Sequence, residues 1–378
     1  MRVFKMKIDV KMIRNTCKVL AFIIIFVYIF IKVSYVLRPE QFPVGSNTIR
    51  EYLKLSPNSI DVVYVGASRV NKFFTPMEAY KRYGLVSANC TGSGLPQQFT
   101  KFVTQEVLKS QSPKLLLISL DIFSTTASLR DEDSYIRYVT DSFPYSFERL
   151  QAIRNGIPNK KSTLSYHFDI AKYHTNVGNL FNKNCWRYAF GLDIGRYIYH
   201  DTDEVSGLNG YFFVKMASSI EYPYYDDISE LPLLDSVNPY YLDLVKYVKG
   251  LDINIIFTIS PHGRDELEHK RINYMRHIAT ENGIIFLNGN DFFDEIGLDS
   301  QIDFYDRNHT NIFGAVKYTE WLCSYLKNHY DIPDRRDDYR YADWNLAYET
   351  WEKKVIEIKT EIIKQMPEEL QLKIQGQM

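Results

Sequence analysis

The chain has 378 residues, and its 45 lysines and arginines nearly balance its 46 aspartates and glutamates, for a formal net charge of −1. This length accommodates one large domain that carries an insertion. Because the charge is balanced and no long basic stripe interleaves with aromatic residues, the composition gives no support for a nucleic-acid partner.

An apolar stretch at residues 19–37 is close to the roughly 20 residues that a helix needs to cross a bilayer. Lys32 is its only charged residue, and it lies near the far end, where its ammonium group can reach the interface. The preceding segment, 1–18, is basic: it holds Arg2, Lys5, Lys7, Lys11, Arg14 and Lys18 against a single acid, Asp9. This excess predicts a transmembrane helix with a cytoplasmic N-terminus and all later residues on the outer side.

Two other interpretations of this stretch are a cleaved signal peptide and a buried core helix. No cleavage site with small residues follows in Ser34–Pro39, and the stretch is long, so an uncleaved anchor is favoured. The flanking basic residues favour a membrane span over a core helix.

The cysteines do not have the pattern of a disulfide framework. Cys17 lies at the predicted membrane edge, and Cys90, Cys185 and Cys323 are widely spaced beyond it. One disulfide among these three is compatible with the sequence, which does not select the pair. No cysteine and histidine cluster with zinc spacing occurs.

Predicted strands and helices alternate through residues 38–333, which we expect to form one α/β domain. Apolar runs predict strands at residues 61–65, 86–90, 115–121, 254–260 and 284–287. Helical spacing and end signals predict helices at residues 49–55, 76–83, 99–107, 235–249, 267–278 and 314–330. Strands in this order predict a flavodoxin-like parallel sheet in a three-layer α/β/α fold.

Two segments depart from this alternation. Residues 122–233 are rich in aromatic residues, glycine and charged pairs, which predicts an insertion or lid over the carboxyl ends of the strands. Residues 334–378 are charged and amphipathic, which predicts a helical C-terminal tail.

The first predicted strand ends at a glycine and is followed by Ser68, which places a hydroxyl at the carboxyl edge of the sheet. A serine becomes a useful nucleophile only when a nearby base accepts its proton. Asp306 and His309 lie on a predicted loop before the last core helix and supply a base with an orienting carboxylate. Either motif alone is weak, but their positions at opposite ends of the alternation favour a catalytic interpretation.

These residues resemble the SGNH (GDSL-like) hydrolases, in particular membrane-anchored members that serve cell-surface polymer acylation. The resemblance lies in Gly66-Ala67-Ser68 and in the segment 303–315, which contains Asp306-Arg307-Asn308-His309. It implies that Ser68 is the nucleophile, that His309 is the base and that Asp306 orients the imidazole. No metal or organic cofactor is implied.

Gly92-Ser93-Gly94 resembles the second block of the family, which implies that the backbone N–H groups of Gly94 and Ser68 hold the oxyanion. Two departures stand out. The first block reads Gly-Ala-Ser-Arg and not Gly-Asp-Ser-Leu, and no Gly-x-Asn-Asp block follows the third strand to supply a side-chain donor. Other residues that could supply this donor are Asn71, Asn89 and Gln97.

Other motifs are weaker. The turn after the first strand lacks the later glycines of a dinucleotide-binding loop, and an α/β-hydrolase elbow would need glycine at Val70. Arg69 and Arg137 are candidates for holding an anionic substrate, since guanidinium groups bind carboxylate or phosphate with two hydrogen bonds. Three further histidines are interpreted as structural: His167, His174 and His262.

The sequence therefore predicts a membrane-anchored serine enzyme that hydrolyses or transfers an acyl ester, with acetyl expected, on a cell-surface glycan. The resemblance and the anchor favour transfer, and they imply a polytopic membrane acyltransferase as the partner that delivers the acyl group. The alternative is a binding or scaffold protein that keeps the fold without the chemistry.

Overall fold

A computed structural model describes residues 10–38, 48–125, 128–158, 162–192 and 210–375. The chain divides into two compact units. We call Met1–Glu40 with Ser162–Asp193 the helical unit, and Gln41–Lys161 with Ile194–Met378 the sheet unit. The basic residues Arg2, Lys5 and Lys7 lie outside the described residues.

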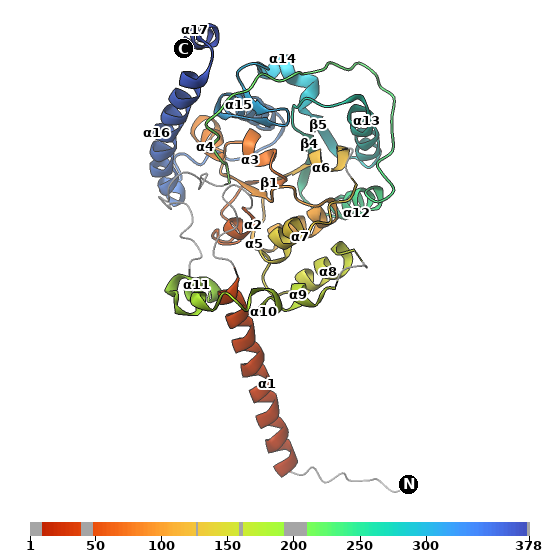
Figure 1. Cartoon of the computed structure of the whole chain (residues 1–378), viewed down its shortest axis with the longest axis vertical. Coiled ribbons are helices and arrows are strands. Elements are labelled where there is room, and N and C mark those ends of the chain that lie inside the picture. The colour runs from red at the N-terminus through yellow and green to blue at the C-terminus, as the bar shows by residue number, and fades with distance from the viewer. Residues whose placement is uncertain (1–9, 39–47, 126–127, 159–161, 193–209, 376–378) are drawn as a thin grey trace. The chain divides into compact units, whose positions relative to one another are not determined.

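The sheet unit contains a five-stranded parallel sheet in the order β2-β1-β3-β4-β5, of which Figure 1 labels β1, β4 and β5. The strands are β1 (Val62–Gly66), β2 (Ser87–Thr91), β3 (Leu115–Ser119), β4 (Asn254–Ile259) and β5 (Ile285–Asn288). This is the strand order of flavodoxin-like sheets, and the predicted parallel α/β architecture is confirmed. The third strand ends two residues earlier than predicted, because Asp121 begins a helix.

The helices of the sheet unit mostly follow the predicted positions. They are α2 (Ile49–Tyr52), α3 (Val70–Phe73), α4 (Pro76–Tyr83), α5 (Thr100–Ser110), α6 (Asp121–Ser124), α7 (Asp133–Thr140), α8 (Phe147–Gly156), α12 (Asn238–Lys249), α13 (Glu266–Glu281), α14 (Phe293–Ile296), α15 (Ile312–His329), α16 (Ala342–Gln365) and α17 (Glu368–Gln375). Short 3₁₀ helices are η1 (Gln97–Phe99), η3 (Gly289–Phe292) and η4 (Tyr339–Tyr341). A two-stranded hairpin, β6 (Phe304–Asp306) and β7 (His309–Thr310), precedes α15.

Both faces of the sheet are covered, because successive side chains of a strand point to opposite faces. Tyr64 of β1 belongs to a core with residues of α3 and α15, and its hydroxyl lies 3.2 Å from the hydroxyl of Tyr318. On the opposite face, the ring of Phe257 in β4 contacts Tyr241 of α12. Because all five residues of β1 are buried, this strand lies in the centre of the three layers.

Gly66 ends β1 at a point where no side chain fits. A Cβ atom there would lie 2.6 Å from Val70 Cγ2 and 2.7 Å from Ser119 Cβ. The glycine therefore allows the turn that carries Ser68 to approach the end of β3 closely.

The predicted insertion at 122–233 is divided between the two units. Its first part contains α6, α7 and α8 and belongs to the sheet unit, whereas residues 162–192 belong to the helical unit. Residues 211–233 contain no helix or strand and run along the sheet unit, where Ser218 N donates to Phe304 O at 2.8 Å. This extended run borders the hairpin that carries Asp306.

The helical unit is built on α1 (Val10–Leu37), which is long and apolar enough to span a membrane. Against it pack α10 (Ile170–Tyr173), η2 (Val177–Phe181) and α11 (Lys183–Ala189), with α9 (Leu164–His167) beside α10 (Figure 1). The Arg38 guanidinium, directly after α1, pairs with Asp169 at 2.6 Å, and both side chains are buried.

The four cysteines are free thiols, so no disulfide forms among the three beyond the predicted membrane edge. Cys90 and Cys323 are buried in the sheet unit, and Cys185 is buried in the helical unit. They act as small apolar side chains in these cores.

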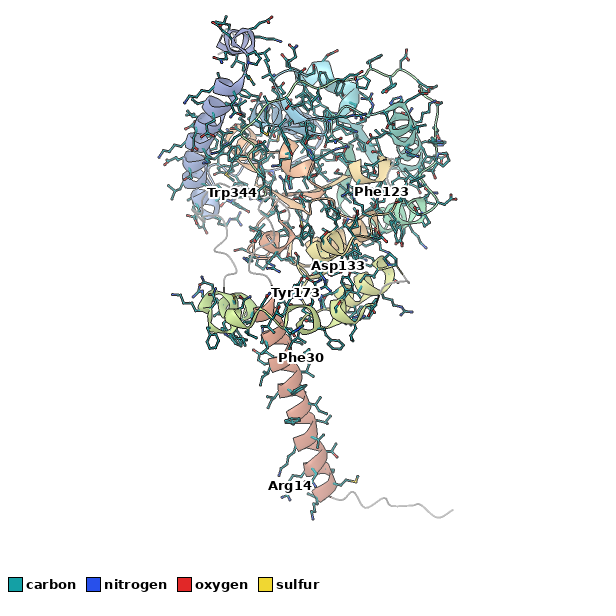
Figure 2. The ribbon with its side chains drawn as sticks, viewed as in Figure 1. Arg14, Phe30, Phe123, Asp133, Tyr173 and Trp344 are labelled. Carbon is teal, nitrogen blue, oxygen red and sulfur yellow. The ribbon has the colours of Figure 1, made fainter. Side chains whose placement is uncertain are left out.

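Helix α16, in the predicted C-terminal tail, packs on the rest of the sheet unit through its tryptophans. Trp344, labelled in Figure 2, lies 5.2 Å from the ring of Tyr80 in α4. Trp351 is fully buried, its indole N–H donates to Glu78 Oε1 at 2.9 Å, and its ring lies 4.7 Å from that of Phe213. The apolar stripe of this predicted tail is therefore part of the core.

We expect Trp351→Ala to lower the free energy of unfolding by about 3–5 kcal/mol, because it removes a large buried side chain and leaves a cavity. Urea unfolding of the detergent-solubilised full chain measures this change. The matched control is Tyr339→Ala, since Tyr339 is 87% exposed and its removal should change stability by about 0.5 kcal/mol or less. Equal stabilities of the two variants would show that α16 does not contribute to the core.

Candidate active site

Ser68 lies at the carboxyl edge of the sheet, in the turn between β1 and α3. His309 begins β7, in the hairpin before α15, 241 positions further along the chain. The Oγ atom of Ser68 lies 2.8 Å from Nε2 of His309, which is hydrogen-bond distance. The fold therefore brings together the two residues that the sequence placed at opposite ends of the alternation.

Asp306 ends β6 and faces the other nitrogen of the same imidazole. Both carboxylate oxygens lie 3.0 Å from His309 Nδ1, and Oδ1 also accepts from the backbone N–H of Asn308 at 2.7 Å. The tight β6–β7 turn makes this contact between residues three positions apart. The ring of Tyr305 stacks on the imidazole at 5.4 Å with an interplanar angle of 12°. The imidazole is thus held on one edge by a carboxylate and on one face by an aromatic ring.

Burial and charge set the proton affinity of these groups. Burial lowers the pKa of His309 below its ordinary value, against the opposing influence of Asp306. Nearby positive charges on Arg69 and Lys72 lower this pKa further. For Asp306, burial acts to raise the pKa, but the hydrogen bond with His309 outweighs it and the net pKa is below its ordinary value. A neutral imidazole beside an ionised carboxylate can accept a proton from Ser68.

The backbone around Ser68 has free donors for an anionic oxygen. The N–H groups of Ser68 and Gly94 donate to no acceptor within the described parts of the chain. The N–H of Gly92, by contrast, donates to Gly66 O at 3.2 Å. This difference favours Gly94 over Gly92 as the second backbone donor.

Gly94 also needs to be glycine for steric reasons. Its φ of +59° lies in the left-handed region, and a Cβ there would be 2.4 Å from Arg130 Nη1 and 2.8 Å from Tyr135 Cε1. The side chains of Arg130 and Tyr135 therefore pack directly on the backbone of Gly94, at the wall of the cleft.

The three residues proposed from sequence as side-chain oxyanion donors are engaged elsewhere. Each amide already donates to another group: Asn71 to Thr91 Oγ1 at 3.1 Å, Asn89 to Phe74 O at 2.9 Å and Gln97 to Ile122 O at 3.0 Å. All three side chains are buried. Asn308 lines the cleft beside Ser68 and His309, and its amide N–H₂ group donates to nothing in the described part of the chain.

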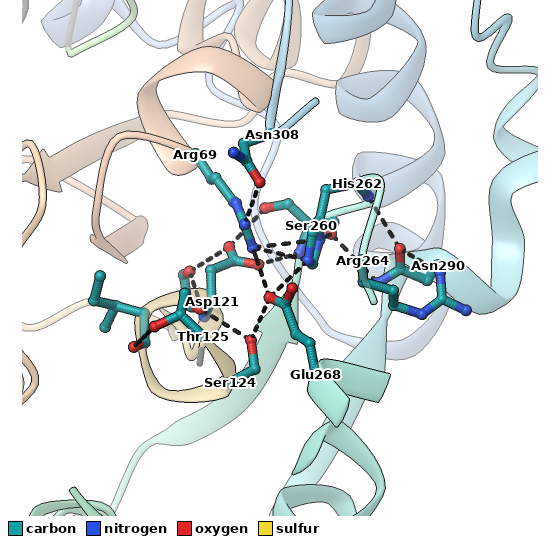
Figure 3. Close-up of polar contacts among 12 residues, drawn as sticks. Arg69, Asp121, Ser124, Thr125, Ser260, His262, Arg264, Glu268, Asn290 and Asn308 are labelled. Carbon is teal, nitrogen blue, oxygen red and sulfur yellow. Dashed lines mark hydrogen bonds and ion pairs between the residues drawn. The ribbon is translucent and has the colours of Figure 1, made fainter. Parts of the chain in front are cut away.

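Arg69, predicted from sequence to hold an anionic substrate, is bound within the protein (Figure 3). Its Nη1 lies 3.1 Å from Asp121 Oδ1 and 3.8 Å from Glu268 Oε1, and its Nη2 donates to Asn308 Oδ1 at 2.7 Å. The side chain lines the cleft but is only 8% exposed. Because two carboxylates already neutralise its charge, this geometry does not support the predicted substrate role.

The acidic partners of Arg69 are themselves held by hydrogen bonds. Asp121 accepts from the hydroxyls of Ser119 at 2.7 Å and Ser260 at 2.9 Å. Glu268 Oε1 lies 2.9 Å from Nε2 of His262, and burial, which raises the pKa of Glu268, is outweighed by His262 and Arg69, which bring it to about 2. His262 is completely buried, in agreement with the structural role predicted for it.

Arg137 does not reach the cleft. It lies on α7, where it pairs with Asp133 at 3.2 Å and Asp141 at 3.5 Å. The arginines that line the cleft besides Arg69 are Arg130 and Arg307. Sequence reasoning missed both, although Arg307 lies within the Asp306–His309 motif and could have been identified from that position.

The cleft around Ser68 has a volume of about 460 Å³ and a polar lining. A second cleft of about 560 Å³ shares Asp265 and Arg307 with it and is also lined by Tyr225, Tyr305 and Asp306. Hence the two clefts meet at the hairpin that carries Asp306 and His309. Across the described ranges, no group of three or more histidine, cysteine, aspartate or glutamate side chains could hold a metal ion.

Comparisons of the chain with protein-family models, with curated proteins and with solved structures found no match. The site is therefore interpreted from its own geometry.

We expect Arg69→Ala to lower the free energy of unfolding by about 3–5 kcal/mol, because Asp121 and Glu268 would keep buried charges without their cation. Arg130→Ala is the matched control: Arg130 lines the same cleft but is partly exposed, so stability should change by about 0.5 kcal/mol or less. Urea unfolding of both variants measures the difference. If Arg69→Ala is as stable as the wild type, Arg69 is not needed for the fold, and a role in binding a ligand would then account for it.

We expect the pKa of His309 to be lower in the native protein than in the unfolded chain, because burial disfavours the imidazolium. Stability should then rise with pH across the interval between the two values, since the unfolded chain binds the extra proton there. NMR titration of ¹³C-histidine-labelled protein measures the pKa, and Asp306→Asn should lower it further. His277 is the internal control, because Glu230 and Glu281 raise its pKa. A pKa of His309 at or above that of His277 would contradict the expectation.

Proposed function

We propose that the chain is a membrane-anchored, serine-dependent acyl-ester hydrolase or O-acyltransferase of the SGNH type that acts on a cell-surface glycan. The observation that carries this proposal is the hydrogen-bonded series Ser68, His309 and Asp306 at the carboxyl edge of the parallel sheet. A nucleophile, a base and an orienting carboxylate at this edge are what acyl transfer through a serine ester requires.

In the proposed reaction, Ser68 Oγ attacks the ester carbonyl while His309 Nε2 takes the hydroxyl proton. His309 then returns this proton to the leaving alcohol, and an acyl ester remains on Ser68. Water or a sugar hydroxyl gives its proton to His309 and attacks this ester, which releases the acyl group and restores the Ser68 hydroxyl. Asp306 stabilises the imidazolium that forms in each half of the reaction.

The negative oxygen of each tetrahedral intermediate needs donors. We assign the N–H groups of Ser68 and Gly94 to this role, and the Asn308 amide as the side-chain donor. The support is that these three donors border the cleft and have no acceptor in the described parts of the chain. Arg69 contributes indirectly, because its bond to Asn308 Oδ1 orients the amide.

The lining of the two clefts supports a hydrophilic substrate. The cleft around Ser68 includes Arg130, Asp265 and Arg307, and the adjoining one adds the rings of Tyr225 and Tyr305. Hydroxyl-rich sugars suit such a mixture of charged groups and aromatic rings better than long acyl chains, which require apolar walls. This composition favours a small acyl group, such as acetyl, on a glycan.

Hydrolysis and transfer use the same residues and differ only in the acceptor. The apolar helix α1 is compatible with a protein held at a membrane, and the family resemblance suggests a polytopic membrane acyltransferase that supplies the acyl group. Co-purification of the full chain in mild detergent tests for this partner, and its absence would favour hydrolysis.

The second candidate is a scaffold protein that keeps the fold without chemistry. The observation that favours it is the missing Gly-x-Asn-Asp block after the third strand. The two candidates differ in whether the Ser68 hydroxyl is a reactive nucleophile. Labelling of this hydroxyl by a serine-directed reagent distinguishes them.

We expect the full chain in detergent to react with a fluorophosphonate at Ser68, because His309 is placed to take the hydroxyl proton. Ser68→Ala should abolish the labelling, His309→Ala should slow it by about 10⁶-fold, and Asn308→Ala should slow it by about 100- to 1000-fold. In-gel fluorescence measures the rates, and mass spectrometry locates the adduct.

Ser229→Ala and His329→Ala are the controls, since both side chains are exposed and neither lines the cleft. They should label at the wild-type rate. Well-folded wild-type protein that remains unlabelled would favour the scaffold candidate.

A further inference from the structure

Residues 162–192 surround the end of α1 within the helical unit, and we call them the collar. They contain α9, α10, η2 and α11. The collar binds the last carbonyl of α1 and the one after it: Asn176 Nδ2 donates to Leu37 O, and Asn179 Nδ2 donates to Arg38 O, both at 3.0 Å. These bonds satisfy groups that the helix itself leaves unpaired.

The length of α1 fixes where the collar lies along the membrane normal. The charged residues Lys18 and Arg38 are 20 positions apart. At a helical rise of about 1.5 Å per residue they are separated by about 30 Å, the thickness of a hydrocarbon core. A span beginning before Lys18 would place more basic residues in lipid, at about 2.5–3.5 kcal/mol each. The hydrocarbon core therefore extends from about Lys18 to about Arg38.

Only part of this length is bare helix. Residues 19–29 of α1 are exposed, but residues 30–38 are partly or fully covered by the collar. The 11 exposed residues account for about 16 Å, little more than half of the hydrocarbon thickness. In the rest of the hydrocarbon thickness, the collar and not α1 must contact the lipid.

Contacts of the collar with individual residues of α1 agree with this depth. Phe168 packs edge to face against Phe30, at a ring distance of 6.0 Å (Phe30 is labelled in Figure 2). Lys32 donates to the carbonyl of Ala189 at 2.5 Å and lies 5.0 Å from the ring of Phe190. Lys32 is 14 positions beyond Lys18, or about 21 Å into the hydrocarbon, so the collar provides the acceptor that lipid lacks. The ammonium group of Lys32 is thus satisfied by the collar and not at the membrane interface.

The exposed surface of the collar combines large apolar and aromatic side chains with polar ones, among them Lys172, Lys183 and Asn184. Its exposed large side chains are Leu164 (60%), Phe168 (46%), Val177 (56%), Phe181 (91%), Phe190 (45%) and Leu192 (58%). Its one acidic residue, Asp169, is buried against Arg38. Aromatic residues and an excess of basic over acidic residues are typical of segments that lie in a membrane interface.

We propose that the collar is immersed in the outer half of the bilayer that α1 spans and binds lipid acyl chains through its exposed apolar side chains. Along the sequence, the chain passes between the helical unit and the sheet unit three times, once after α1 and once at each end of the collar. This inference depends on α1 crossing the bilayer and is independent of whether Ser68 is reactive.

A nitroxide label at Phe181→Cys tests this immersion in the full chain, reconstituted in phosphatidylcholine nanodiscs. The background carries Cys17→Ser, because Cys17 is exposed and the other cysteines are buried. We expect the label to be relaxed more strongly by oxygen, which concentrates in lipid, than by a water-soluble nickel chelate. Tyr224→Cys is the matched control, an exposed aromatic position (86%) in the sheet unit, where the order of the two reagents should reverse.

A label at Leu192→Cys gives a second collar position in case the first substitution disturbs the fold. Stronger relaxation by the nickel chelate at both collar positions would overturn the proposal, since it would place them in water. Shielding of both positions from both reagents would also overturn it, because protein and not lipid would then cover the collar.

Discussion

The guanidinium group of Arg69 joins the elements on which the candidate site depends. Arg69 lies in the turn after β1, and its partners Asp121, Glu268 and Asn308 come from the first residue of α6, from α13 and from the β6–β7 turn. A buried cation with fixed carboxylate partners tolerates little movement, because an unpaired charge in the protein interior is costly. The turn that carries Ser68 and the hairpin that carries His309 are thereby held in one geometry. The same positive charge helps to lower the pKa of His309.

A second buried ion pair has a similar position in the helical unit. Arg38 follows α1 directly and pairs with Asp169, which is 131 positions away in the chain. In both units an arginine at the end of a regular element is bound by a carboxylate from a distant segment. Buried pairs of this kind specify one arrangement more than they add stability. In the helical unit, the Arg38–Asp169 pair holds the collar against the last turns of α1.

Most of the fold could be predicted because its signals are local. Apolar runs marked the five strands of the sheet, and their order along the chain predicted the parallel topology. The spacing of Asp306 and His309 was equally local, because a tight turn brings residues three positions apart into contact. The insertion at 122–233 could not be divided from sequence, since its short helices have weak periodicity and its middle part packs against α1.

Taken by itself, the sequence determined the parallel α/β sheet, the apolar helix and the motifs that contain Ser68 and His309, because each depends on patterns within a few residues. Only the tertiary structure decided which polar groups form hydrogen bonds and ion pairs with one another. It brought Ser68 within 2.8 Å of His309 and enclosed Arg69 among carboxylates that the sequence did not connect with it. It also left Arg137 away from the cleft. The physical reason is that the partner of a buried charge is set by packing between distant segments, which no local pattern encodes.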